Sequence, residues 1–167
     1  DYTEAYFKVG FAWKLRPLEL AILRDLCIWR EVESRVRDIP RNRLIKEPSL
    51  FEMARKQPQD AAHLQRIEDI PSRTLRNDTE TLLTIIRTSA ASDATSWPAR
   101  LDAPLAPSEA PLMKMLKKYV RDVAEALNLP PELLMRKKEY EAIVRSGMKG
   151  GKHALPERLL GWRYEVI

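Results

Sequence analysis

Helical periodicity interrupted by proline is the feature that most limits the fold of this chain. Apolar residues recur every three or four positions between Pro17 and Pro40, which predicts an amphipathic helix over residues 17–37. Pro17 is tolerated in its first turn, and the helix is expected to end near Asp38, because a residue before proline avoids helical geometry. The expected apolar stripe consists of Leu18, Ile22, Leu26, Trp29, Val32 and Val36.

Further helices are predicted, and prolines again lie near their ends. Ser49 and Glu52 match the S/T-x-x-E capping box and predict a helix starting at Ser49. Helices are also expected over 59–67 and 72–88, and a second long one runs from Pro111 towards Pro130. Three short helices around a flexible turn at 147–152 complete the chain. Because no strand alternation occurs, the sequence predicts an all-α fold.

The composition changes sharply between residues 89 and 110. This segment is rich in Ala, Ser and Pro and lacks periodicity, which is typical of a linker, although Trp97 and Leu101 are expected to dock on a neighbouring domain. We therefore predict two small helical domains, 17–88 and 111–167, joined by the 89–110 linker and preceded by a 1–16 segment.

Composition excludes several classes of protein. With 32% charged residues and no long apolar run, neither a membrane span nor a signal peptide is expected, and the chain should be cytoplasmic. Cys27 is the sole cysteine and is expected to be buried and inert. His63 and His153 lie far apart, so we predict no metal site in this chain. Its start at Asp1 rather than Met suggests a piece of a longer protein.

A resemblance to the bacterial ribonuclease D family is carried by the order of several motifs. WRE followed by IPRNRLIKEPSL, within residues 15–58, and IPSRTLRNDTETLLTII resemble the HRDC domain that follows the exonuclease domain in that family. YFKVGFAWKL resembles the segment between those two domains. PLMKMLKKYVRDVAEALNLPPELLMRKKEYEAIV and the closing LLGWRYEVI resemble the second, C-terminal helical domain. Both helical domains are therefore expected to be HRDC-like.

The resemblance implies a 3′-to-5′ exoribonuclease that trims tRNA precursors. Such enzymes hold two divalent metals, Mg²⁺ or Mn²⁺, about 4 Å apart with four acidic residues of a DEDD exonuclease domain. That domain is not recognisable here. Asp78 and Glu80 form an Asp-x-Glu, but inside a helical pattern, and Tyr119 has Asp122 three positions on rather than four. No catalytic or metal-binding residue is therefore expected, and the exonuclease domain should lie upstream in the same protein.

Basic residues are concentrated in the C-terminal third. Residues 111–167 hold twelve basic and seven acidic residues, a net charge of +5, against +2 for 1–88 and −2 for 89–110. RNA phosphates are natural partners for such a charge, although a basic helix face is often only solvated. The candidate RNA-binding residues are Arg41, Arg43, Lys114, Lys117, Lys118, Arg121, Arg136, Lys137, Lys138, Lys149 and Lys152.

The candidate RNA-binding residues are predicted on different grounds. Most bases near Pro40 are expected to pair with neighbouring acids, and Arg41 and Arg43 are chosen because they lie beyond the acids of the helix. Lys114, Lys117, Lys118 and Arg121 share one face through spacings of three, four and seven. The glycine-rich turn that holds Lys149 and Lys152 fits neither a P-loop nor a KH motif.

Three functional hypotheses stay open. The first is a module that positions RNA for an exonuclease domain. The second is a scaffold that packs on that domain and contacts RNA little. The third is the HRDC region of a RecQ-like helicase, against which the tandem arrangement and the Gly-Trp-Arg ending argue.

Overall fold

The protein is built from helices alone in the part that the structure describes. The computed structural model covers residues 2–166, without the side chains at positions 149 and 150. Its α-helices are α1 (Pro17–Val36), α2 (Arg41–Leu44), α3 (Glu47–Lys56), α4 (Ala61–Gln65), α5 (Ser72–Ala90), α6 (Ala110–Ala126), α7 (Pro131–Leu134), α8 (Lys137–Gly150) and α9 (Trp162–Val166). Its 3₁₀ helices are η1 (Ala5–Lys8), η2 (Ala12–Lys14), η3 (Ala94–Ser96), η4 (Pro107–Glu109) and η5 (Glu157–Leu159). No strand occurs among these residues, which confirms the all-α prediction.

The chain divides into two compact units, with the division between Ala103 and Pro104. The first unit includes the 1–16 segment, because Tyr6, Val9 and Leu15 are buried in its core. The segment predicted as a linker, 89–110, is shared between the two units.

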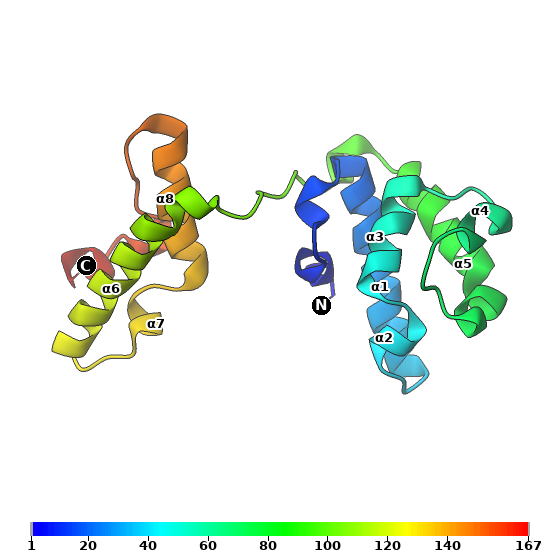
Figure 1. The fold of residues 1–167 in the computed structure, drawn as a ribbon, viewed down its shortest axis with the longest axis horizontal. Coiled ribbons are helices and arrows are strands. Elements are labelled where there is room, and N and C mark those ends of the chain that lie inside the picture. Colours follow the sequence, from blue (N-terminus) through cyan, green and yellow to red (C-terminus); the bar gives the residue numbers. More distant parts are fainter. Residues whose placement is uncertain (1, 167) are drawn as a thin grey trace. The chain divides into compact units, whose positions relative to one another are not determined.

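In the first unit, α1 packs against α3 and α5 (Figure 1). Leu20, Leu23 and Leu26 are fully buried, and burial of each such side chain contributes about 1.5–3 kcal/mol. The predicted stripe is wrong at its C-terminal end, where Val32 and Val36 are 44% and 74% exposed. There the buried positions are polar instead: Arg30, Glu31 and Ser34. Apolar spacing could not reveal this change, because Arg30 and Glu31 pair with Glu47 and Arg41 of the following helices, and the Ser34 hydroxyl donates to the Glu31 carbonyl.

Helix α1 ends in a Schellman motif rather than simply running into Pro40. Asp38 adopts a left-handed φ of 50°. The Ile39 amide donates to the Ser34 carbonyl at 2.9 Å, and the Asp38 amide donates to the Arg35 carbonyl at 3.2 Å. The end of the helix near Asp38 is therefore as predicted, and the motif turns the chain directly into α2.

The capping box predicted at Ser49 is wrong. Helix α3 starts at Glu47, and Ser49 lies inside it, 1% exposed. Its hydroxyl donates to the Glu68 carbonyl at 2.9 Å, a partner 19 residues away. Pro48 is tolerated in the first turn, so the helix begins before the serine.

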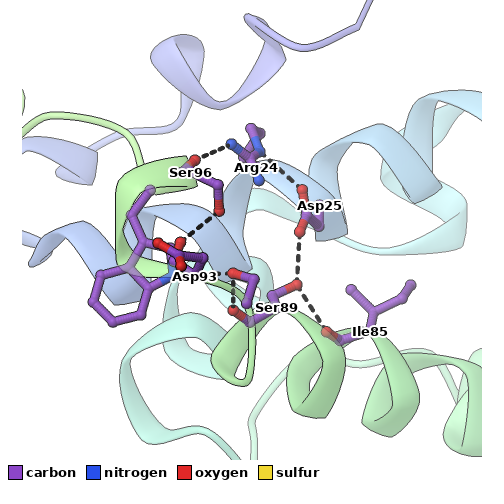
Figure 2. A network of polar contacts seen from close by, with 8 residues as sticks. Arg24, Asp25, Ile85, Ser89, Asp93 and Ser96 are labelled. Atoms are coloured by element: carbon purple, nitrogen blue, oxygen red, sulfur yellow. Dashed lines mark hydrogen bonds and ion pairs between the residues drawn. The ribbon is translucent and has the colours of Figure 1, made fainter.

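The first part of the predicted linker is fixed to the first unit by the polar network in Figure 2. The Ser89 hydroxyl contacts an Asp25 carboxylate oxygen at 2.7 Å, and the Arg24 guanidinium donates to the Ser96 carbonyl at 3.0 Å. The Trp97 indole N–H donates to the Ser92 hydroxyl at 3.0 Å. The Arg24 bond ties the segment after α5 to α1, and the Ser89 bond ties α5 itself to α1. Leu101 also packs on the core of this unit.

In the second unit, α6 packs against α7 and α8. Its core contains Val120, Ala124, Leu134, Met135, Tyr140, Ile143 and Leu159. The predicted flexible turn at 147–152 is only partly correct: residues 147–150 continue α8, and Gly151 ends it with a φ of 69°. A left-handed position suits glycine because glycine lacks a Cβ.

The second unit repeats the local architecture of the first. Helix α6 also ends in a Schellman motif, with Asn128 at a φ of 53° and a 2.9 Å bond from the Leu129 amide to the Ala124 carbonyl. A prolyl residue, a four-residue helix and a longer helix follow in both units. Asp38 and Asn128 lie 90 positions apart, and so do the starts of α2 and α7 and of α3 and α8.

Candidate nucleic-acid interface

A basic pocket lies in the second unit, where α6, α7 and the start of α8 meet. It has a volume of about 370 Å³. Its lining residues are Lys117, Arg121, Pro131, Glu132, Met135, Arg136, Lys137 and Tyr140. Four are cations and one is an acid, so the lining carries a formal net charge of +3.

The pocket brings together two predicted groups that are separate in the sequence. Lys117 and Arg121 lie one turn apart on α6, whereas Arg136 and Lys137 lie at the N-terminus of α8. The turn through α7 returns the chain so that the two pairs line one cavity. All four side chains are exposed to solvent and able to meet a ligand.

The other predicted bases of this unit do not line the pocket. Lys114 and Lys118 are exposed on α6, and Lys138 is exposed on α8. Lys152 is exposed beyond the end of α8. The side chain of Lys149 lies outside the described residues. The candidate interface is therefore a pocket, with further exposed cations on the same two helices.

Tyr140 forms an apolar wall of the pocket and was missed by sequence reasoning. It is 6% exposed. Burial raises the pKa of its phenol, and Glu132 raises it further, while Arg121 opposes the shift. Tyr140 therefore stays neutral and contributes a phenol ring and hydroxyl beside the cations. Its place in an apolar helix stripe resembled an ordinary core position, so no sequence signal distinguished it.

Glu139 fixes the position of α8 beside the pocket. Its carboxylate accepts the Arg136 backbone N–H at 2.5 Å and also pairs with the guanidinium of Arg158. Glu139 is 8% exposed, and it pairs with Arg158 at the edge of the fold, where the arginine side chain stays exposed. The Lys137 ammonium lies 3.8 Å from the Glu141 carboxylate, a weak contact at the surface.

In the first unit, Arg41 pairs with an acid of α1 although it lies beyond that helix in the sequence. Arg41 was chosen because it follows the acids of α1, yet its guanidinium lies 3.1 Å from the Glu31 carboxylate. Glu31 also accepts from Arg35 at 3.1 Å, and Arg37 pairs with both Glu33 and Asp78. These pairings confirm the expectation that most bases near Pro40 bind neighbouring acids. Arg43 is exposed and forms no ion pair with the described residues.

Asp78 and Glu80 do not form a metal site. Asp78 is 4% exposed and accepts two hydrogen bonds from Arg37, at 2.9 and 2.5 Å. Glu80 is exposed, and its carboxylate lies 3.8 Å from Arg87. Within residues 2–166 no three His, Cys, Asp or Glu side chains converge on a possible metal position. Cys27 is buried as expected, and burial raises the pKa of its thiol to about 12.

The chain is similar to known proteins in both sequence and structure. The HRDC domain model matches residues 19–86, which span α1 to α5. Ribonuclease D of Pseudomonas paraeruginosa is 42% identical over 165 residues, which cover 99% of this chain and 44% of that protein. The chain corresponds to the C-terminal, HRDC-containing region of bacterial ribonuclease D.

A second relative and a solved structure are also ribonuclease D proteins. Ribonuclease D of Bartonella henselae is 30% identical, over 99% of this chain and 40% of that protein. The crystal structure of Escherichia coli RNase D, an exoribonuclease involved in structured RNA processing, matches with a TM-score of 0.71 and 26% identity. That match covers 99% of this chain and 44% of the E. coli chain. The chain thus spans less than half the length of the ribonuclease D proteins that it matches.

The HRDC match falls within the first unit, inside the predicted 17–88 domain. The basic pocket lies in the second unit, outside the matched residues. None of the described helices is both long enough and apolar enough to cross a membrane.

Proposed function

We propose that this ribonuclease D region binds RNA and positions it for an exonuclease domain of the same protein. The observation that carries the proposal is the convergence of Lys117, Arg121, Arg136 and Lys137 on one pocket. Guanidinium and ammonium groups gathered in this way favour phosphate oxygens. The parent protein would be a cytoplasmic 3′-to-5′ exoribonuclease acting on tRNA precursors, with Mg²⁺ or Mn²⁺ held by its exonuclease domain.

The proposed recognition is electrostatic and largely independent of sequence. Charged groups of this kind contact the phosphate backbone, which sets position and affinity rather than base identity. Exposed Lys114, Lys118, Lys138 and Lys152 extend the field around the pocket. In the first unit, by contrast, the bases near Pro40 are largely neutralised by Glu31, Glu33 and Asp78.

The test is titration of the chain into labelled tRNA at several salt concentrations. We expect dissociation constants from submicromolar to micromolar at low salt. The logarithm of the affinity should fall linearly with the logarithm of salt concentration, by about 0.7 to 0.9 for each phosphate contacted. No binding at low salt, or binding that is indifferent to salt, would contradict the proposal.

A second candidate function is a scaffold that packs on the exonuclease domain. Large apolar side chains favour it, because Leu160, Trp162 and Tyr164 are 58%, 51% and 63% exposed. In a longer protein, packing against another domain would remove these apolar side chains from water, which is energetically favourable.

One variant of the parent enzyme separates the two functions. We expect replacement of Lys114, Lys117, Lys118 and Arg121 by Ala to weaken tRNA binding while thermal stability is retained. Unchanged affinity with altered thermal stability would favour the scaffold. Because all four side chains are exposed, their loss should not disturb the core.

A further inference from the structure

The 90-residue repeat makes positions of the two units equivalent, and at one such place the first unit has acidic residues where the second unit has basic ones. Beyond Asp38 and Asn128, buried apolar residues also match at this interval: Leu44 with Leu134 and Ile45 with Met135. The short helix and the start of the following helix are therefore in the same register in both units. Each charged residue near these positions in the first unit therefore has an equivalent in the second unit, 90 positions later.

In the first unit, this position is occupied by the protein's own ion pairs. Glu31 on α1 binds Arg41 at the start of α2 at 3.1 Å. Arg30 is 1% exposed and lies 3.6 Å from Glu31 and 3.8 Å from Glu47, the first residue of α3. Two acids thus neutralise the bases that meet between the three helices.

In the second unit, the acids of this position are replaced. Arg121 stands where the first unit has Glu31, and Lys137 stands where it has Glu47. Pro131 replaces Arg41, and buried Val120 replaces Arg30. The internal pairs cannot form, and the cations instead line the open pocket. Among the described residues, Lys117 and Arg121 form no ion pair.

We propose that this pocket seats a single phosphate group of the bound RNA, and that the Glu31–Arg41 pair neutralises the equivalent position in the first unit. The proposal rests on the RNA-binding function proposed above and assigns it to one pocket in one unit. Lys117 and Arg121 approach the phosphate from α6, and Arg136 and Lys137 approach it from the start of α8. The free volume of about 370 Å³ leaves room for the attached sugar.

The test converts the second unit to the pattern of the first. In the double variant Arg121→Glu with Pro131→Arg, the new carboxylate and guanidinium occupy the positions of Glu31 and Arg41 and can pair across the pocket. The matched control is Lys118→Ala, which has the same net charge change of −1 on the same helix, outside the pocket. Arg121→Ala serves as a simpler variant should the double variant fail to fold.

Two probes are used with each protein: tRNA, and inorganic phosphate followed by the amide NMR spectrum. We expect the double variant to weaken tRNA binding roughly ten- to a hundredfold, the range for losing a hydrogen-bonded charged contact. Its salt slope should fall by about one phosphate contact. Lys118→Ala should change affinity only a few fold. Phosphate should shift amides around Lys137 in the wild type, but not in the double variant, and not around Glu47.

The outcomes separate this proposal from the RNA-binding proposal. If the wild type binds tRNA and the double variant loses no more affinity than Lys118→Ala, the pocket proposal is wrong while RNA binding stands. If the wild type does not bind tRNA, RNA binding fails, and the phosphate titration alone decides the pocket. Equal phosphate shifts in both units would also overturn it, because the first-unit position would then bind phosphate despite its ion pair. Phosphate binding without tRNA binding would support a seat for free phosphate instead of RNA.

Discussion

Glu31 is the carboxylate that contacts three bases of the first unit. Its carboxylate contacts Arg35 and Arg41, each at 3.1 Å, and lies 3.6 Å from buried Arg30. Burial alone raises the pKa of Glu31, but the hydrogen bonds from Arg35 and Arg41, together with the charges of Arg41 and Arg30, outweigh burial. The pKa therefore lies below its ordinary value of 4.5. This carboxylate should stabilise the fold only while it is ionised.

Replacing Glu31 by Gln should change the acid sensitivity of the first unit. Because the folded pKa lies below 4.5, the stabilisation by Glu31 is complete above pH 4.5 and is lost as the pH falls below that value. We expect Glu31→Gln to lower the free energy of unfolding by about 3 kcal/mol at neutral pH, because buried Arg30 keeps only the more distant Glu47 as an anionic partner. Urea unfolding down to about pH 3 should show a flatter profile for the variant. An unchanged profile would contradict this role; exposed Glu68→Gln is the control.

Asp78 is expected to be structural rather than catalytic. Its carboxylate is nearly buried and holds Arg37 through two hydrogen bonds, which are the largest cause of the raised pKa of that guanidinium. Asp78→Asn should therefore lower the free energy of unfolding by about 3 kcal/mol, because Arg37 is left without its main anion. Thermal unfolding measures the loss. Glu80→Gln is the control and should have little effect; a stable Asp78→Asn protein would refute the structural role.

At the scale of elements, the helix ends decide where functional side chains lie. The Schellman motifs after α1 and α6 turn the chain through Pro40 and Pro130 into four-residue helices. In the second unit this turn brings Arg136 and Lys137 back to α6, and Glu139 holds that end of α8 in place. The geometry of the pocket therefore depends on the geometry of this turn.

The left-handed residue at the end of α1 offers a test of this turn. Asp38 has a φ of 50°, a conformation that glycine adopts without the steric penalty of a Cβ. We expect Asp38→Gly to raise the free energy of unfolding by roughly 0.5 to 1 kcal/mol, and β-branched Asp38→Val to lower it by about 1 kcal/mol or more. Chemical denaturation distinguishes the two variants. Equal stabilities would show that the turn is not fixed by this residue.

At the scale of the whole molecule, each unit has an apolar core of its own. The core of the first unit draws on residues from η1 to α5, whereas the second unit has a smaller core built on α6, α7, α8 and η5. Small domains bury a smaller fraction of their surface and are correspondingly less stable. The second unit also exposes several large apolar side chains, including Met115 and Leu160.

The two units should therefore differ in stability as separate fragments. We expect a fragment of residues 1–103 to unfold cooperatively on heating, because its core is complete without residues 104–167. The 104–167 fragment should unfold at a lower temperature. Differential scanning calorimetry of both fragments and of the entire chain provides the measurement. A disordered 1–103 fragment would show that its core depends on the remainder of the chain.

The sequence by itself determined the all-α fold, the positions of the long helices and the basic character of the second unit, because periodicity, proline and charge act locally. It also identified the four cations of the pocket. Only the tertiary structure decided that Lys117 and Arg121 share a cavity with Arg136 and Lys137 while Lys114 and Lys118 remain outside. Tertiary contacts likewise bury Ser49 inside α3 and pair Arg41 with Glu31. Such pairings join segments separated by ten or more residues, so they depend on how helices pack and not on the local pattern.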